Sequence, residues 1–171
     1  MSKYLITFTL LFLAALSRIV PHPVNVAPIT AIALFAGVYL ERKHTFIIPI
    51  AAMLISDYFI GFYNAMIWVY LSVIMIGFIG LWLNRHRGVL PTIGASLAGS
   101  VLFFIVTNLG VWISWYPHTL TGFIGCYTVA IPFFRNTMLG DLGYVTVLFG
   151  IYELVKRFIP SAIGEPKSVQ E

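Results

Sequence analysis

Residues 64–83 read NAMIWVYLSVIMIGFIGLWL, and residues 84–87, which follow directly, read NRHR. The first stretch is long enough to cross the hydrocarbon core of a bilayer, since a spanning helix needs about 20 predominantly apolar residues. The second stretch is a short polar gap that carries two arginines. An apolar stretch followed by a short basic gap is typical of a multi-pass membrane protein, and the pattern recurs along the chain.

The composition of the whole chain also favours a membrane protein. Of its 171 residues, 60% are hydrophobic, 16% are aromatic and only 9% are charged. A soluble domain of this length could not hide so much apolar surface from water. The net charge of +4 is spread over several short gaps, which indicates a positive-inside bias rather than nucleic-acid binding. The single cysteine, Cys126, excludes an internal disulfide and a CxxC metal site.

Six segments are long and apolar enough, or nearly so, to span a bilayer. They lie at about 4–20, 26–41, 45–61, 64–83, 89–113 and 136–159. Six spans place every basic gap and both termini in the cytoplasm, whereas a seventh span would move Lys156 and Arg157 outside. We therefore predict an all-α integral membrane protein, a compact bundle of six transmembrane helices. It forms a single domain over 1–160, followed by a disordered cytoplasmic tail over 161–171.

Two stretches need separate treatment. Residues 117–132 hold an apolar run of about 12 residues that is interrupted by glycines and prolines, which favours a re-entrant or interfacial segment over a span. At the N-terminus, Lys3 and the apolar residues after it resemble a signal peptide with a cleavage site near Ser17. The apolar run continues past that site, so we expect a retained helix.

The six-span threading brings the polar residues of the apolar segments to one face, opposite the basic gaps. Asp57 and Asp141 lie inside or near hydrocarbon, where an ionised carboxylate costs a few kcal/mol. Structural salt bridges with Arg18 or Arg135 would offset this cost, and the same network could line a polar pocket. We predict that this face binds a small molecule. The candidate binding residues are Arg18, His22, Asn25, Asp57, Tyr58, Asn64, Asn108, Trp112, Trp115, Tyr116, His118, Arg135, Asn136 and Asp141.

The sequence contains no familiar catalytic pattern. It lacks the GxSxG and HExxH patterns and the phosphate-binding loop of ATPases. We therefore expect neither an enzyme nor a bound cofactor, and the chain cannot energise transport alone. Two alternatives stay open at this point. One is a haem- or quinone-binding redox or assembly subunit, because His22 and His118 lie near aromatic residues; the other is a membrane enzyme or a structural partner protein.

Five local strings carry a resemblance to a known group of proteins. They are RIVPHPVNVAP at 18–28, ALFAG at 33–37, SDY at 56–58, WYPHT at 115–119 and PFFRNTMLGD at 132–141. Together they resemble a poorly characterised bacterial inner-membrane family that is similar, in size and topology, to the substrate-binding S-components of energy-coupling-factor (ECF) vitamin transporters. The resemblance implies a multi-pass protein of the bacterial inner membrane that binds a vitamin or corrinoid at its outer face and moves it inward.

The resemblance also implies a partner and a ligand set. S-components typically dock a transmembrane and ATPase module through an Ala-x-x-x-Ala pattern on their first helix. The first helix here has Ala14 and Ala15 with no small residue four positions away. Some solitary S-component-like proteins handle cobalamin, and His22, His118 or Cys126 would then be the available cobalt ligands.

Small residues four positions apart occur elsewhere in the chain. They are the pairs Ala27/Ala31, Ala33/Gly37 and Ala95/Gly99. This spacing lets two helix backbones approach closely. We therefore expect the second and fifth apolar segments to pack tightly inside the bundle.

Overall fold

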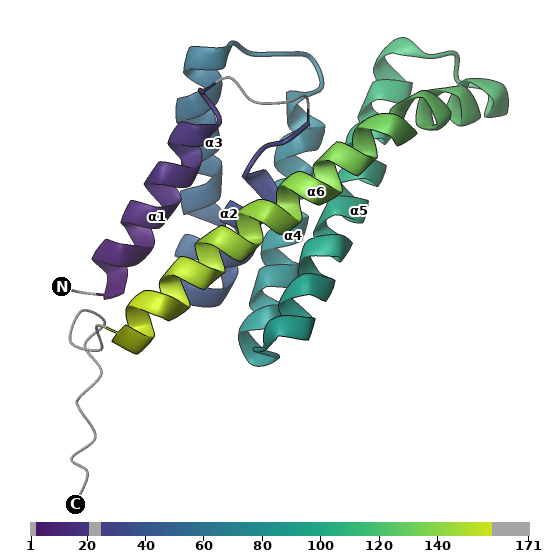
Figure 1. Ribbon diagram of the computed structural model, residues 1–171. Helices are drawn as coiled ribbons and strands as arrows, with labels where there is room; N and C mark the ends of the chain where they lie inside the picture. The colour runs from purple at the N-terminus through teal and green to yellow at the C-terminus, as the bar shows by residue number, and fades with distance from the viewer. Residues whose placement is uncertain (1–2, 21–24, 159–171) are drawn as a thin grey trace, which may run out of the picture.

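The computed structural model describes residues 3–20 and 25–158, and these residues form six helices and no strand. The helices are α1 Lys3–Ser17, α2 Ile29–Tyr39, α3 His44–Ile60, α4 Met66–Arg85, α5 Val89–Trp115 and α6 Leu120–Phe158. Figure 1 shows them running alternately up and down, so that α1 begins and α6 ends at the same, lower end of the molecule. The all-helical fold is as predicted. The predicted tail and His22 lie outside the described residues.

The first five helices lie close to their predicted positions, and the sixth does not. Helix α6 begins at Leu120 and runs without interruption for 39 residues, through the stretch predicted to be a separate re-entrant or interfacial segment. At 1.5 Å per residue its path is about 58 Å long, roughly twice the thickness of a hydrocarbon core. Pro132 lies inside the helix, where it removes a backbone hydrogen bond and favours a bend. Figure 1 shows the bent course of α6.

Helix α2 is the centre of the fold. Its residues from Thr30 to Val38 are all buried, and α2 contacts each of the other five helices. An 11-residue helix that is apolar on every side is stable only when other elements surround it. Pro28 precedes the first turn, and its missing N–H costs nothing there because the first donors of a helix have no partner inside it.

Helices α2 and α4 approach each other closely at two glycines. A Cβ atom added to Gly37 would lie 2.6 Å from the carbonyl carbon of Gly80, which is too close for any side chain. A Cβ atom on Gly99 of α5 would likewise lie 2.7 Å from Cγ2 of Thr30 on α2. Two of the predicted small-residue pairs, Ala33/Gly37 and Ala95/Gly99, therefore lie at tight helix contacts.

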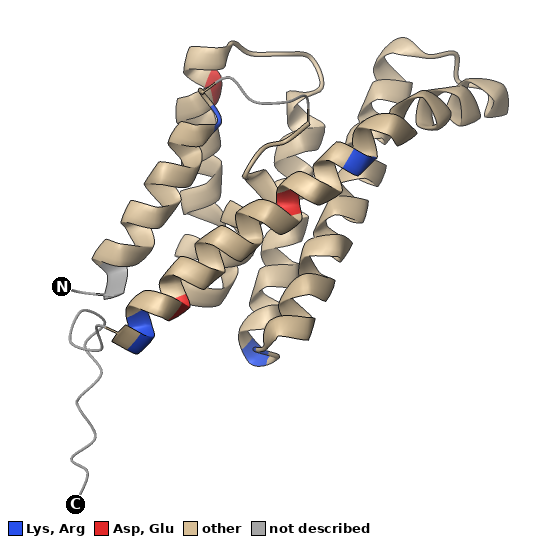
Figure 2. Cartoon of the chain, viewed as in Figure 1, with Lys and Arg blue, Asp and Glu red and all other residues tan. Residues whose placement is uncertain are grey.

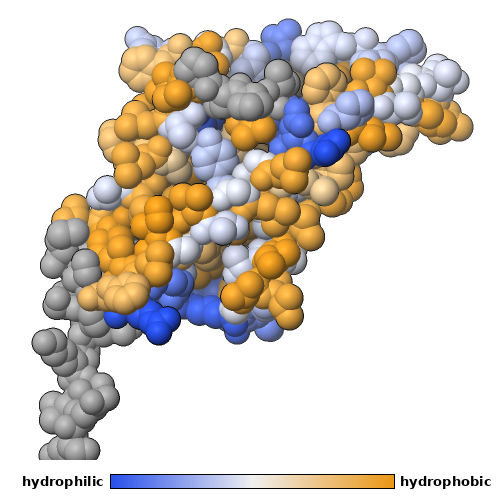
Figure 3. All heavy atoms as spheres, viewed as in Figure 1, coloured by the Kyte–Doolittle hydropathy of each residue, from blue (hydrophilic) through white to orange (hydrophobic). Residues whose placement is uncertain are grey.

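The outer surface of the bundle is largely apolar. Large hydrophobic side chains are more than a third exposed on α1, α3, α4, α5 and α6, and Figure 3 shows hydrophobic residues over much of the visible face. Figure 2 shows basic residues at the lower end of the bundle, where α4 meets α5 and where α6 ends. We call this end the basic end. Soluble monomers rarely expose such extensive apolar surface. Three helices, α4, α5 and α6, are long and apolar enough to cross a membrane, which indicates a membrane protein.

Candidate functional site

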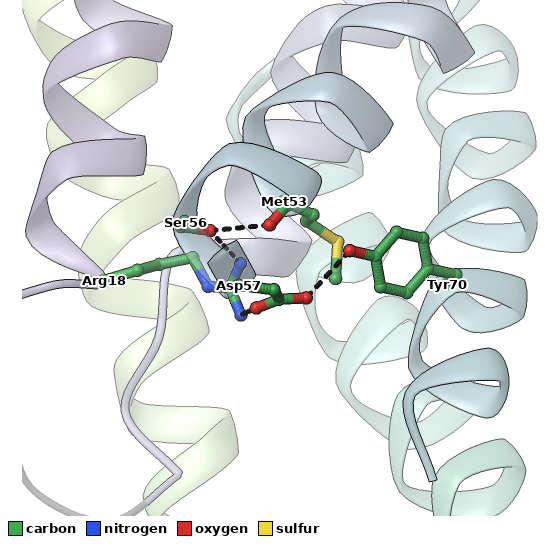
Figure 4. A network of polar contacts seen from close by, with 5 residues as sticks. All are labelled: Arg18, Met53, Ser56, Asp57 and Tyr70. Atoms are coloured by element: carbon green, nitrogen blue, oxygen red, sulfur yellow. Dashed lines mark hydrogen bonds and ion pairs between the residues drawn. The ribbon is translucent and has the colours of Figure 1, made fainter. Parts of the chain in front are cut away.

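The end of the bundle opposite the basic end contains a buried ion pair. Arg18, in the turn after α1, directs Nη2 to Oδ1 of Asp57 on α3 at 2.8 Å. Its other terminal nitrogen donates to the hydroxyl oxygen of Ser56, and the hydroxyl of Tyr70 on α4 donates to Oδ2 of Asp57 at 2.8 Å. Figure 4 shows this cluster, in which Ser56 also donates to the Met53 carbonyl at 3.0 Å. The cluster ties together three helices.

Burial explains why each member of the cluster is needed. Asp57 is fully buried and Arg18 is only 9% exposed, so neither charge is well solvated. Removing two ions from water costs several kcal/mol for each ion, and the pair offsets this cost only with good geometry and further hydrogen bonds. Tyr70 supplies such a bond to the second carboxylate oxygen, which would otherwise lack a partner. The prediction that Asp57 lies close to an arginine is confirmed.

The second buried carboxylate, Asp141, has a different environment. It lies on α6, is 2% exposed, and has hydroxyl partners rather than an arginine. Its Oδ2 atom is 2.6 Å from Oγ of Ser100 on α5, and Thr30 on α2 hydrogen-bonds it as well. Arg135, which lies nearly two turns earlier on α6, is exposed and forms no ion pair with Asp141 in the described part of the chain.

Arg18 and Asp141, two of the buried ionisable residues, line the same cavity. A cavity of about 400 Å³ is lined by Arg18 from the end of α1, by Asp141 from α6 and by residues of α2, α3 and α5. Its full lining is Arg18, Asn25, Ala27, Ile29, Thr30, Ile60, Tyr63, Phe103, Thr137 and Asp141. The wall is therefore mainly apolar, with two ionisable groups and several hydrogen-bonding groups at defined places.

A second hollow lies beside the first and shares part of its wall. Its volume is about 290 Å³, it includes Asn108 of α5, and both hollows are lined by Asn25, Phe103 and Thr137. Asn25 has a φ of 62°, a left-handed conformation that asparagine tolerates better than most residues. The backbone conformation at Asn25 thus helps to shape both hollows just before α2 begins.

The structure brings together only some of the predicted binding residues. Arg18, Asn25 and Asp141 line the larger hollow, Asn108 lines the smaller one, and Asp57 lies behind Arg18. The remaining described candidates line neither of these two hollows. They are Tyr58, Asn64, Trp112, Trp115, Tyr116, His118, Arg135 and Asn136.

The turn between α5 and α6 holds its own local cluster. Trp112 donates from Nε1 to the Pro117 carbonyl at 3.1 Å, and Nε2 of His118 lies 3.0 Å from the Ile113 carbonyl. The rings of Trp112 and His118 meet edge to face at 5.5 Å. This arrangement accounts for the two side chains as a structural turn.

Two of the candidate metal ligands, His118 and Cys126, lie in the described residues, and each contacts a backbone carbonyl. The Cys126 thiol contacts the Asn108 carbonyl at 3.6 Å, while His118 belongs to the turn just described. Within residues 3–20 and 25–158, no group of three or more His, Cys, Asp or Glu residues could hold a metal ion. The described donors therefore give no support to a cobalt site.

Three residues that hydrogen-bond the two buried carboxylates were not among the candidates predicted from the sequence. They are Thr30, Tyr70 and Ser100, which supply the hydroxyl partners of the two carboxylates. Each is a polar residue inside an apolar segment, and such residues usually face the interior of a membrane bundle. Ser96 and Ser100, four positions apart on α5, carried the clearest signal, because both fall on one helix face.

A third hollow lies at the basic end. It has a volume of about 760 Å³ and is lined by residues of α2, α4, α5 and α6, among them Arg87, Glu153 and Lys156. The Tyr39 hydroxyl donates to Oε1 of Glu153 at 2.8 Å on its wall. Asp141 lines the 400 Å³ cavity and its neighbour Leu142 lines this third hollow, so α6 borders both.

The comparisons with known proteins identify the chain only at the level of a family. No curated protein and no solved structure matches it. Residues 1–162 match a family of unknown function, DUF6580. The match covers all six helices and both carboxylates of the site. The chain therefore belongs to the DUF6580 family.

Proposed function

We propose that this protein is a membrane transport protein that binds a small molecule in the 400 Å³ cavity and moves it across the bilayer. The observation that carries the proposal is that Arg18 and Asp141, both buried, line one cavity at one end of an apolar bundle. Ionisable groups at membrane depth are costly, and they most often mark a ligand or ion pathway.

The cavity has the dimensions and chemistry of a ligand site. Small-molecule pockets range from about 300 to 1,000 Å³ and combine an apolar lining with a few placed polar groups. The 400 Å³ cavity falls in this range, and its polar groups come from Arg18, Asn25, Thr30, Tyr63 and Asp141. The adjoining 290 Å³ hollow would extend the site for a larger ligand.

The hollow at the basic end supports transport over simple binding. A transporter needs access to its site from each side in turn, with closely packed residues separating the two sides. The two hollows lie toward opposite ends of α2, with Thr30 on the first and Val38 on the second. The residues between them, 31–37, are buried. A shift of α6 against α2 would open one hollow and close the other.

The proposed membrane arrangement is six spans in the bacterial inner membrane, with both termini in the cytoplasm. It places the basic end inside, as the positive-inside rule requires, and the 400 Å³ cavity at the outer face. Helix α2 is too short to span by itself, since its 11 residues extend about 16 Å, so it would lie inside the bundle among longer helices. The resemblance to ECF S-components rests on the size of the chain and on this six-span topology, and a vitamin or corrinoid is the ligand class that the resemblance suggests.

The test is ligand binding by the full chain purified in detergent. We expect one compound of a vitamin and corrinoid panel to raise the unfolding temperature, because a ligand at 100 times its Kd adds about 2.7 kcal/mol of stability. Thr137→Leu should abolish the effect by filling the cavity. Thr128→Leu is the matched control: both threonines lie on α6 and bond the carbonyl one turn earlier, but Thr128 is exposed and lines neither hollow. A folded protein that binds no compound of the panel would refute the proposal.

A further inference from the structure

The hydrogen-bond geometry around Asp141 favours a protonated carboxyl group. Ser100 Oγ lies 2.6 Å from Oδ2 of Asp141 and 3.0 Å from the carbonyl oxygen of Ser96. A carbonyl oxygen and an ionised carboxylate only accept hydrogen bonds, and a serine hydroxyl has one hydrogen to donate. Each of the two short contacts has a hydrogen of its own when Asp141 carries a proton and donates it to Ser100, which in turn donates to the Ser96 carbonyl. With an ionised Asp141, the single hydroxyl hydrogen of Ser100 would be shared between two acceptors.

The charged residues around Asp141 also favour its protonated form. Helix α6 packs against α1, α2 and α5. Helix α5 has no titratable residue, and α2 has only Tyr39, which lies at the basic end. On α6 itself, Arg135 is exposed. No cationic side chain of the described residues pairs with Asp141.

The remaining charged group on the cavity wall is already neutralised. Arg18, in the turn after α1, forms an ion pair with Asp57 at 2.8 Å. Tyr63, on the α3–α4 loop, is neutral, because burial, and then the charge of Asp57, raise the pKa of its phenol above the ordinary value. The cavity wall therefore has no net charge when Asp141 is protonated and a charge of −1 when Asp141 is ionised. A ligand that carries a single positive charge would therefore neutralise the wall when Asp141 is ionised.

We propose that Asp141 holds a proton in the ligand-free protein and exchanges it for the positive charge of a monocationic organic ligand. In this step the Asp141 O–H bond breaks and its proton passes to water. The resulting carboxylate pairs with the cationic group of the ligand, so the total charge is unchanged. The inference rests on the proposed function, and it narrows the ligand to the class of small organic amines and quaternary ammonium compounds.

The exchange also gives Arg18 and Asp57 a role at this site. Their pairing keeps the arginine from repelling the incoming cation, since the field of Arg18 is largely cancelled by a carboxylate in direct contact. The hydroxyls of Ser100 and Thr30 then stabilise the Asp141 carboxylate once it has lost its proton.

The first arm of the test needs no ligand. Infrared spectroscopy of the wild-type protein at neutral pH should show the carbonyl stretch of a protonated carboxylic acid. The band should vanish in Asp141→Asn and persist in the control variant Glu41→Gln, which removes an exposed carboxylate that lines neither hollow. Absence of the band from folded wild-type protein would overturn the inference.

The second arm uses benzylamine, benzyl alcohol and benzoate, which share one ring and differ in charge, together with the panel used for the proposed function. We expect benzylamine to bind and the other two not to. Its affinity should rise about tenfold for each unit by which the pH is increased while Asp141 of the free protein is still protonated, and it should level off once Asp141 is ionised. Below that point, titration calorimetry across buffers of different ionisation enthalpy should show one proton released per ligand.

The outcomes distinguish the proton exchange at Asp141 from the proposed transport function. If only neutral or anionic compounds bind, or if benzylamine binds without releasing a proton, the exchange is wrong while the transport proposal stands. If no compound of any charge binds to folded protein, the transport proposal fails and the exchange fails with it. Benzylamine binding with proton release that is lost in Asp141→Asn supports both.

Discussion

Removing the charge of Asp57 should destabilise the protein more than removing the charge of its partner, Arg18. Asp57→Asn keeps the shape of the side chain and its contact with Tyr70 but leaves the Arg18 guanidinium, 9% exposed, without a counter-charge. An arginine cannot lose its proton in a protein, so the buried charge persists. Arg18→Met leaves a buried carboxylate instead, and that group can neutralise itself by binding a proton.

The magnitudes follow from this difference. Removing one partner of a buried pair costs about 3–5 kcal/mol, and we expect Asp57→Asn to fall in this range. Arg18→Met should cost less than Asp57→Asn. The double variant Arg18→Met/Asp57→Asn leaves no lone charge, so it should cost less than the sum of the single variants by about 0.5–3 kcal/mol.

The assay is reversible unfolding of the purified protein in mixed detergent micelles, with the free energy of unfolding compared across the mutant cycle. Tyr58→Phe is the control, because Tyr58 adjoins Asp57 in sequence but is 73% exposed, and exposed substitutions change stability by about 0.5 kcal/mol or less. Equal costs for the two single variants, or a double variant equal to their sum, would refute the reasoning.

Three further predictions test the packing and the topology. Gly37→Ala should destabilise the bundle by about 1–3 kcal/mol, because its Cβ would meet the Gly80 backbone at 2.6 Å. Gly143→Ala, whose Cβ would meet nothing within 4 Å, should instead stabilise its helix by about 0.5–1 kcal/mol. Thermal unfolding of the two variants compares these effects. Ala31→Leu, at a fully buried position of α2, should cost about 1–3 kcal/mol by overpacking, and unchanged unfolding would place this face of α2 against lipid. A reporter fused after Glu171 should behave as cytoplasmic in whole cells, and a periplasmic signal would overturn the six-span threading.

Local sequence determined the helices with few errors, and the one large error has a local cause. An apolar stretch bounded by a polar gap specifies a helix through its own length and composition, so α3, α4 and α5 begin and end within a few residues of prediction. Residues 117–132 were separated from the sixth helix because prolines and glycines usually end helices. Pro132 instead bends α6 without ending it, since a membrane helix keeps the rest of its backbone hydrogen bonds.

The sequence by itself determined which carboxylates would lie in apolar surroundings, where an ionised group is unfavourable. Only the tertiary structure decided which side chains each carboxylate contacts. A carboxylate in an apolar segment must find a partner, so Asp57 and Asp141 were identifiable from sequence. Hydrophobic length is a property of one segment, whereas a partner depends on how helices distant in sequence rotate and pack. That packing gave Asp57 an arginine from the end of α1 and a tyrosine from α4, and gave Asp141 hydroxyls from α2 and α5. The difference between an ion pair and a protonatable carboxyl therefore arises from tertiary contacts.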